Sequence, residues 1–114
     1  MAITNAQITS SANPIYTSSG NNAITTVIIC NNSTFNPSLP TANQSLLYMY
    51  AVQSGGSPLD SGASANIIVN GLPIPAGETV TFDQEKIVLA NGDSLYAKTD
   101  SASNLIATVS TLAV

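Results

Sequence analysis

The sequence predicts an all-β protein: an antiparallel β-sandwich of about eight strands with a jelly-roll-like path. Segments rich in β-branched and aromatic residues recur at intervals of about 8–12 residues. Clusters of Gly, Pro, Asn and Ser separate these segments and indicate turns. No segment has the apolar period of about 3.6 residues that a helix requires. The chain has 114 residues, so we expect one domain that spans residues 1–114.

Four strands are expected in the N-terminal half. Segments 6–9 and 14–17 are short, and Pro14 places the second at a sheet edge or strand start, because proline cannot donate a ladder hydrogen bond. β-Branched residues fill segment 23–31, which predicts a central strand. Segment 45–52 is apolar on both alternating faces, so both faces should be covered. Residues 32–44 lack periodicity and are expected to form a loop.

The C-terminal half contains the remaining expected strands, at 66–69, 79–82, 86–89, 94–99 and 105–114. The pair Asn70-Gly71 is expected to form a turn after the first of them. The Gly/Ser-rich segment 53–65 is expected to be a long flexible connection.

The distribution of charge is the most informative feature of the chain. It has two Lys and six Asp or Glu, and all eight lie between positions 60 and 100. Elsewhere the polar residues are Ser, Thr and Asn, which can be buried against a partner without the cost of desolvating an ion. Charge depletion is typical of interface cores. We therefore expect much of the uncharged surface to be covered in the working state.

The composition excludes several classes of function. The chain has no His and no Arg, so it offers no imidazole base or metal ligand and no guanidinium for phosphate. Two positive charges give negligible counterion release on a nucleic acid. We expect no cofactor, no metal, no nucleic acid and no membrane as partners. No apolar stretch approaches the ~20 residues of a membrane span.

Few residues could carry chemistry. Glu78, Asp83 and Glu85 could act as a general acid and base, but their turn context favours a solvated connection. Oxygens of the Asn91-Gly92-Asp93 and Asp60-Ser61-Gly62 segments could bind calcium, although neither has the EF-hand spacing. Four tyrosine rings could stack on a sugar, although such rings more often fill the core of a sandwich. They are Tyr16, Tyr48, Tyr50 and Tyr96. We expect no catalytic residue.

Cys30 is the single cysteine of the chain. It lies in an apolar run, so a buried thiol is expected, with an interchain bridge or a nucleophile as alternatives. Residues 1–22 have no basic region and no long apolar run, so we expect no secretory leader and synthesis in a cytoplasm.

The uncharged N-terminal segment and the final strand are the expected contact surface. Residues 1–22 are expected to serve as an extended assembly arm. The expected interface residues are Ile8, Ile15, Tyr16, Ile24 and Leu112. We expect a homo-oligomer, with a trimer favoured.

Three segments carry a resemblance to a known family: residues 15–32 (IYTSSGNNAITTVIICNN), 73–80 (PIPAGETV) and 91–97 (NGDSLYA). They resemble small virion proteins of tailed bacteriophages, especially those that infect cyanobacteria. The resemblance covers most of the chain, except segments 32–44 and 53–65. It implies a structural role in the virion after assembly in the host cytoplasm, with no catalytic residue to carry over.

Within that resemblance, the leading hypothesis is a head decoration or cement protein that binds the major capsid protein. The alternatives are a neck, tail or fibre-associated adaptor, and a glycan-binding attachment module. An enzyme would require a mechanism based on carboxylates alone.

Overall fold

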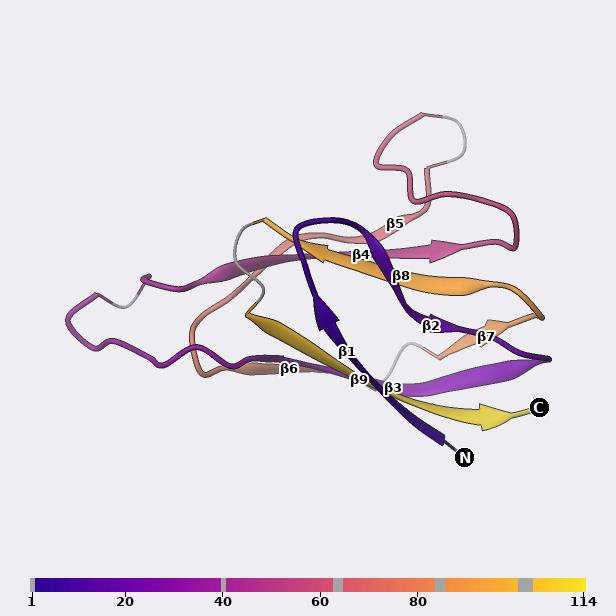
Figure 1. The fold of residues 1–114 in the computed structure, drawn as a ribbon, viewed down its shortest axis with the longest axis horizontal. Coiled ribbons are helices and arrows are strands. Elements are labelled where there is room, and N and C mark those ends of the chain that lie inside the picture. Colours follow the sequence, from indigo (N-terminus) through magenta and orange to yellow (C-terminus); the bar gives the residue numbers. More distant parts are fainter. Residues whose placement is uncertain (1, 40, 63–64, 84–85, 101–103) are drawn as a thin grey trace.

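The structure is a computed structural model that describes residues 2–39, 41–62, 65–83, 86–100 and 104–114. These residues form nine strands and no helix, in two antiparallel sheets that face each other (Figure 1). The strands are β1 (Ala2–Ile8), β2 (Asn13–Thr17), β3 (Asn22–Asn31), β4 (Ser45–Val52), β5 (Ile67–Ile74), β6 (Thr79–Phe82), β7 (Ile87–Leu89), β8 (Ser94–Thr99) and β9 (Leu105–Ala113). The predicted all-β antiparallel sandwich is confirmed.

The strand order is nested. Sheet A has the order β1-β9-β3-β6, with β7 also paired to β3, and sheet B has the order β2-β8-β4-β5. The first strand therefore pairs with the last, β2 with β8, β3 with both β6 and β7, and β4 with β5. The strands of the first half of the chain are therefore paired antiparallel with strands of the second half.

Alternation of side chains along the strands builds one core between the sheets. Every second residue of β9 faces inward, from Leu105 to Thr111, and is almost fully buried. The core cluster comprises Ile8, Ile15, Ile24, Val27, Ile29, Leu47, Met49, Ile74, Leu89, Leu95, Ala97, Leu105, Ala107 and Val109. Both sheets contribute to it, so the apolar residues of the uncharged N-terminal segment bury their side chains within the chain itself.

Residues 1–22 are not an extended arm, because the described part of this segment lies inside the sheets. β1 pairs along its whole length with β9, from Ala2↔Thr111 to Ile8↔Leu105. β2 pairs with β8 at the edge of sheet B, as expected for a strand that contains Pro14.

β5 also differs from expectation. Asn70 and Gly71 lie inside this strand and do not form a turn. Opposite them, the register changes between Leu47↔Leu72 and Tyr48↔Asn70, so that Gly71 is an extra residue with a φ of 78°. This is a β-bulge, in which glycine adopts the left-handed conformation at little cost. The left-handed backbone conformation that makes Asn-Gly favourable in a hairpin turn therefore forms a bulge in an edge strand here.

Both faces of β4 are covered. Leu47 and Met49 face the core, whereas Tyr50 and Val52 point outward and are nevertheless buried. The connection between β4 and β5 folds over these two side chains and covers the outer face of sheet B at this point. Its residues Asp60 and Gly56 lie against Tyr50 and Val52 respectively.

Candidate assembly interface

The structure divides the five expected interface residues into two groups. Ile8, Ile15 and Ile24 are 1%, 3% and 2% exposed and belong to the core. They are therefore wrong as contact residues, because strand alternation turns them between the sheets. Tyr16 is half-buried and packs against the same core. Leu112 is 43% exposed and lies on the outer surface of sheet A.

The outer surface of sheet A is the face on which the uncharged segments meet. The strand register aligns its outward side chains in rows that cross the sheet. The rows are Gln7–Ile106–Cys30–Thr79, Asn5–Thr108–Ile28–Thr81, Ile3–Ser110–Thr26 and Leu112–Ala23–Val88. We call these 14 residues the neutral face, since none of them carries a charge.

The neutral face combines small hydroxyl and amide groups with exposed apolar side chains. Ile3 and Val88, at opposite edges, are 69% and 66% exposed, and Ile28, near the centre, is 37% exposed. Hydroxyls are partly engaged within the face, as in the Thr108 Oγ1 bond to Asn5 Oδ1 at 3.0 Å. The face therefore offers apolar contact and uncharged hydrogen-bonding groups to a partner.

Cys30 lies on the neutral face, between Ile106 and Thr79 in the ladder. Its side chain is half-buried and the thiol is free. The expectation of a fully buried thiol is therefore wrong. The cause is the phase of β3: Ile29 and Asn31 point into the core, so Cys30 must point outward.

Charged groups lie on the outer face of sheet B, in turns and at the β6–β7 edge of sheet A, where Lys86 Nζ donates to the carbonyl oxygens of Asp83 and Thr25. Lys98, on the outer face of sheet B, lies 5.1 Å from the centroid of the Tyr48 ring and 4.0 Å from Asp60 Oδ2. Asp93 holds a turn, because its two oxygens accept hydrogen bonds from the backbone nitrogens of Ser54 and Ala90 at 2.9 and 3.0 Å. The two surfaces of the sandwich therefore differ in electrostatic character.

Asp60 also anchors the β4–β5 connection to sheet B. The Tyr50 hydroxyl donates a hydrogen bond of 2.6 Å to Asp60 Oδ1. Burial, reinforced by this bond and by the nearby carboxylate charge, raises the pKa of Tyr50 to about 12. Tyr50 thus has a structural role in fixing the connection.

The structure separates the two described members of the expected acidic group. Glu78 and Asp83 flank β6 at its two ends, and five residue steps at about 3.3 Å separate their backbones by roughly 16 Å. Glu85, the third member of the expected group, lies outside the described residues. Among the described residues no group of three or more metal-ligating side chains comes together.

The tyrosines are distributed between the core and the outer face of sheet B. Tyr48 and Tyr96 are half-buried on the neighbouring strands β4 and β8, and both point outward. Tyr50, between them on β4, is covered by the connection described above. Tyr16 is also half-buried but packs against the core, so Tyr48 and Tyr96 are the tyrosines with exposed ring surface on the outer face of sheet B.

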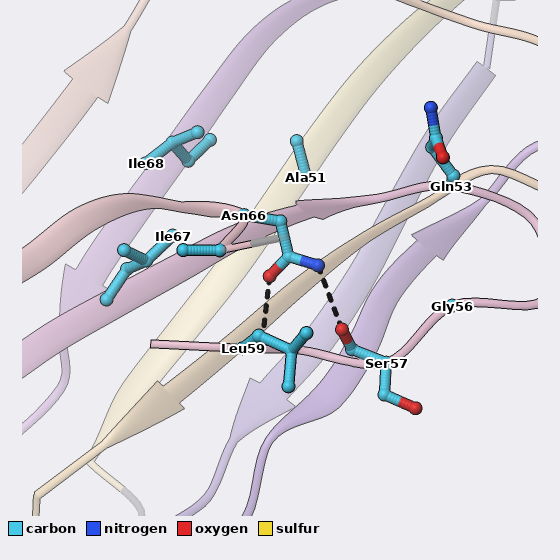
Figure 2. Close-up of a pocket in the computed structure, with 9 residues that line it drawn as sticks. Ala51, Gln53, Gly56, Ser57, Leu59, Asn66, Ile67 and Ile68 are labelled. Carbon is cyan, nitrogen blue, oxygen red and sulfur yellow. Dashed lines mark hydrogen bonds between the residues drawn. The ribbon is translucent and has the colours of Figure 1, made fainter. Parts of the chain in front are cut away.

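A pocket of about 560 Å³ lies between the β4–β5 connection and the adjacent strands. Figure 2 shows that the Asn66 amide bridges two points of the connection: Oδ1 accepts a hydrogen bond from Leu59 N and Nδ2 donates one to Ser57 O, both at 2.8 Å. The amide therefore shapes the loop, and these two bonds use one of its two N–H groups and one of its two acceptor sites. Sequence reasoning missed this pocket, since it depends on how the Gly/Ser-rich connection folds back.

A second, apolar cleft opens between the edges of the two sheets. β5 forms one lip, and β6 and β7 form the other. Its volume is about 420 Å³ and its lining consists of Ile24, Val27, Met49, Ile68, Val69, Phe82 and Ile87.

Comparison of the chain with protein-family models, curated proteins and solved structures finds no significant match. Within the described ranges, no helix is long and apolar enough to cross a membrane. A proposal of function therefore depends on the surfaces of this chain.

Proposed function

We propose that this chain is a non-enzymatic structural protein of a bacteriophage virion, and specifically a decoration or cement protein that binds the head shell through the neutral face. The absence of charge from all 14 side chains of that face is the observation that carries the proposal. A soluble β-protein ordinarily distributes both signs of charge over its surface and guards its strand edges with them. Here the 14 outward side chains carry no charge, although Lys86 lies at the β6–β7 edge of the same sheet and bonds to Thr25 O.

The size of the neutral face determines how strongly one copy can bind. Strands lie about 4.8 Å apart and outward residues repeat every ~6.8 Å along them, so the 14 side chains of the face cover roughly 460 Å². Docking hides a similar area on the partner, so the contact buries roughly 900 Å² in total. A single contact of this size is in the range of weak interfaces, below about 1,200 Å², so attachment depends on the avidity of many identical copies on one shell.

The strand order supports a role in a virion. Nested pairing of first with last, second with eighth, third with sixth and seventh, and fourth with fifth strand is compatible with the jelly-roll path that we propose for this chain. Jelly rolls recur in viral capsid proteins, although they also occur in lectins and other classes. The fold is therefore compatible with the proposal and does not carry it alone.

The charge distribution suggests an orientation on the particle. Lys98 and Asp60 lie on the outer side of sheet B. With the neutral face against the shell, these ions keep their hydration. The reverse orientation would have to desolvate them.

Binding to shells assembled without this chain tests the proposal. Co-sedimentation is expected to saturate at a fixed number of copies per shell, and a particle reconstruction should place sheet A toward the shell. Absence of binding to such shells would reject the cement role. Density at the neck or tail would instead assign the chain to the adaptor class.

Tyr48, Tyr96 and Lys98 favour a second candidate, a glycan-binding attachment module. The half-buried rings of Tyr48 and Tyr96 lie on the adjacent strands β4 and β8, with the Lys98 ammonium group over the Tyr48 ring, and aromatic rings with a polar edge are suited to contacts that are partly wet. Binding on a glycan array that is lost in Tyr96→Ala, with the fold intact, supports this function. An array without signal rejects it.

A further inference from the structure

The edges of the two sheets differ in how they are protected against pairing with a further strand. Among the described residues, the edge strands are β1 and the β6–β7 pair in sheet A, and β2 and β5 in sheet B. An edge strand presents a row of N–H and C=O groups that only water or another strand can satisfy. Proteins guard such rows with proline, bulges, charges or short strands, so an edge without these guards is open to a partner strand.

The edges other than β1 carry such guards. β2 is five residues long, contains Pro14 and changes register directly after it. β5 contains Pro73 and changes register with β4 at two points, one of which is the Gly71 bulge. β6 and β7 are four and three residues long, and Lys86 between them donates a hydrogen bond of 2.8 Å to Thr25 O. Proline, bulges, short strands and a charge therefore interrupt these edges.

β1 has none of these features. Its seven residues include no proline and no charge. They pair with β9 from Ala2↔Thr111 to Ile8↔Leu105 without a change of register. Pairing with β9 uses the backbone groups on one side of the strand, and those of alternate residues point to the other side. β1 is therefore a regular, neutral strand at the end of its sheet.

The accessible part of this edge is the segment 2–6. Directly after β1 the chain crosses to sheet B, where Thr99 N donates a hydrogen bond of 2.9 Å to Thr9 O. The crossing covers the end of the strand at Ile8, which is 1% exposed. Towards the other end, Ile3 is 69% exposed. A partner strand therefore has room along residues 2–6.

We propose that segment 2–6 of one copy pairs antiparallel with the same segment of a second copy, about a twofold axis that passes through Thr4. Thr4 then lies opposite Thr4 of the other copy, Ile3 opposite Asn5, and Ala2 opposite Ala6. Opposite residues are both even or both odd in number. The backbone groups that point away from β9 in one copy therefore meet those of the other, as an antiparallel ladder requires.

The side chains that this pairing brings together are compatible, which is why a second copy is the partner. Like charges usually oppose the pairing of two identical edges, and this segment has none. Thr–Thr pairs across antiparallel strands are favourable. Thr4 is half-buried and points between the sheets beside Ala6, which packs against the core. On the outer side, the exposed Ile3 side chain is covered by Asn5 of the other copy.

Such a contact is isologous and closes after two copies, so it predicts a dimer where the sequence favoured a trimer. The two A sheets form one continuous sheet, and both neutral faces lie on the same side of it. Together these faces cover roughly 900 Å², so docking on a shell buries roughly 1,800 Å², which is the size of a standard interface. This last consequence rests on the proposed function, whereas the pairing needs only copies of this chain.

Thr4→Lys and Thr4→Glu test the pairing at its axis. Each variant places two like charges opposite each other in the dimer, whereas in the free chain a long side chain at an open edge can reach water. Light scattering after size-exclusion chromatography should find a wild-type dimer, with the dissociation constant of each variant raised at least tenfold. An equimolar mixture of the two variants pairs opposite charges and should recover heterodimers.

Thr79→Lys is the matched control, because Thr79 is exposed on β6 at the opposite edge of the same sheet. It should leave association unchanged. Circular dichroism verifies that each variant is folded. Hydrogen exchange of the wild type requires no variant: amides of segment 2–6 should exchange more slowly as the protein concentration rises, and those of β2 and β5 should not.

Four results would overturn the inference: a monomeric wild type at millimolar concentration, a trimer, Thr4 variants that associate as the wild type does, or a mixture that stays monomeric. None of these measurements involves a shell. A monomer that binds shells would reject the pairing alone. A dimer that fails to bind shells would reject the cement role alone.

Discussion

A charge placed on the neutral face should separate folding from assembly. Ile28→Lys is the most informative change, because Ile28 lies near the centre of the face between Thr108 and Thr81 and is 37% exposed. In the free protein the lysine stem can lie along the sheet with its ammonium group in water. The differences in β-propensity span about 1 kcal/mol, so the melting temperature should fall by no more than roughly 4–8 °C.

The same change should be far more costly once the face is covered. An unpaired charge buried in a contact costs about 3–5 kcal/mol, which corresponds to a loss of affinity of roughly 10²- to 10³-fold or more. Thermal denaturation of the free protein and co-sedimentation with shells measure the two effects. Asn70→Lys is the control, because Asn70 is exposed on β5 opposite Tyr48. It should change neither quantity appreciably.

Two results would refute the reasoning. Equal shell binding by Ile28→Lys and the wild type would mean that the neutral face stays in water. Unfolding of free Ile28→Lys would mean that the residue belongs to the interior. Ile8→Lys illustrates the latter case, because Ile8 is in the core and this variant should not fold.

Three further predictions concern the fold. Asn31→Ala removes the buried amide that serves both ends of the β3–β4 connection, so unfolding free energy should fall by about 3 kcal/mol, and hydrogen exchange in the connection should accelerate. Tyr50→Phe should cost about 1.5 kcal/mol at pH 7. Because the pKa of Tyr50 is raised to about 12, the stabilisation that its hydroxyl provides is complete below pH 10 and is lost as the pH rises through 12. Denaturation between pH 8 and 12 should show that the free energy of unfolding falls less with rising pH in the variant than in the wild type. Gly92→Ala should cost about 2 kcal/mol, since φ is 89° and a Cβ would lie 2.5 Å from Ser54 Oγ, and chemical denaturation measures it.

The sequence predicted the sandwich because alternation and turn residues are local signals. β3, β4 and β8 lie within a residue of their expected bounds. β5 was mispredicted because Asn70-Gly71 has the same backbone preference in a turn and in a bulge, and only pairing with β4 decides between them. β1 begins earlier than expected, since its polar residues face outward at a sheet edge while β9 supplies its hydrogen bonds.

The sequence could predict which segments contribute to the candidate interface, but not which of their side chains lie on it. The charge map correctly marks the first and last strands as uncharged, but it does not tell which side chains point outward. Ile8 and Ile24 were therefore assigned to a contact surface although they belong to the core. Thr81 and Val88 come from the charged part of the sequence and still complete the neutral face, because their strands pair with β3.

Alkylation of Cys30 tests the central claim, that the neutral face is covered in the assembled state. The chain has one cysteine, and that residue lies half-buried on this face, so the reaction with a maleimide reports on this surface alone. We predict that the thiol reacts in the free protein and at least tenfold more slowly in the particle. Equal rates in the two states would contradict the account.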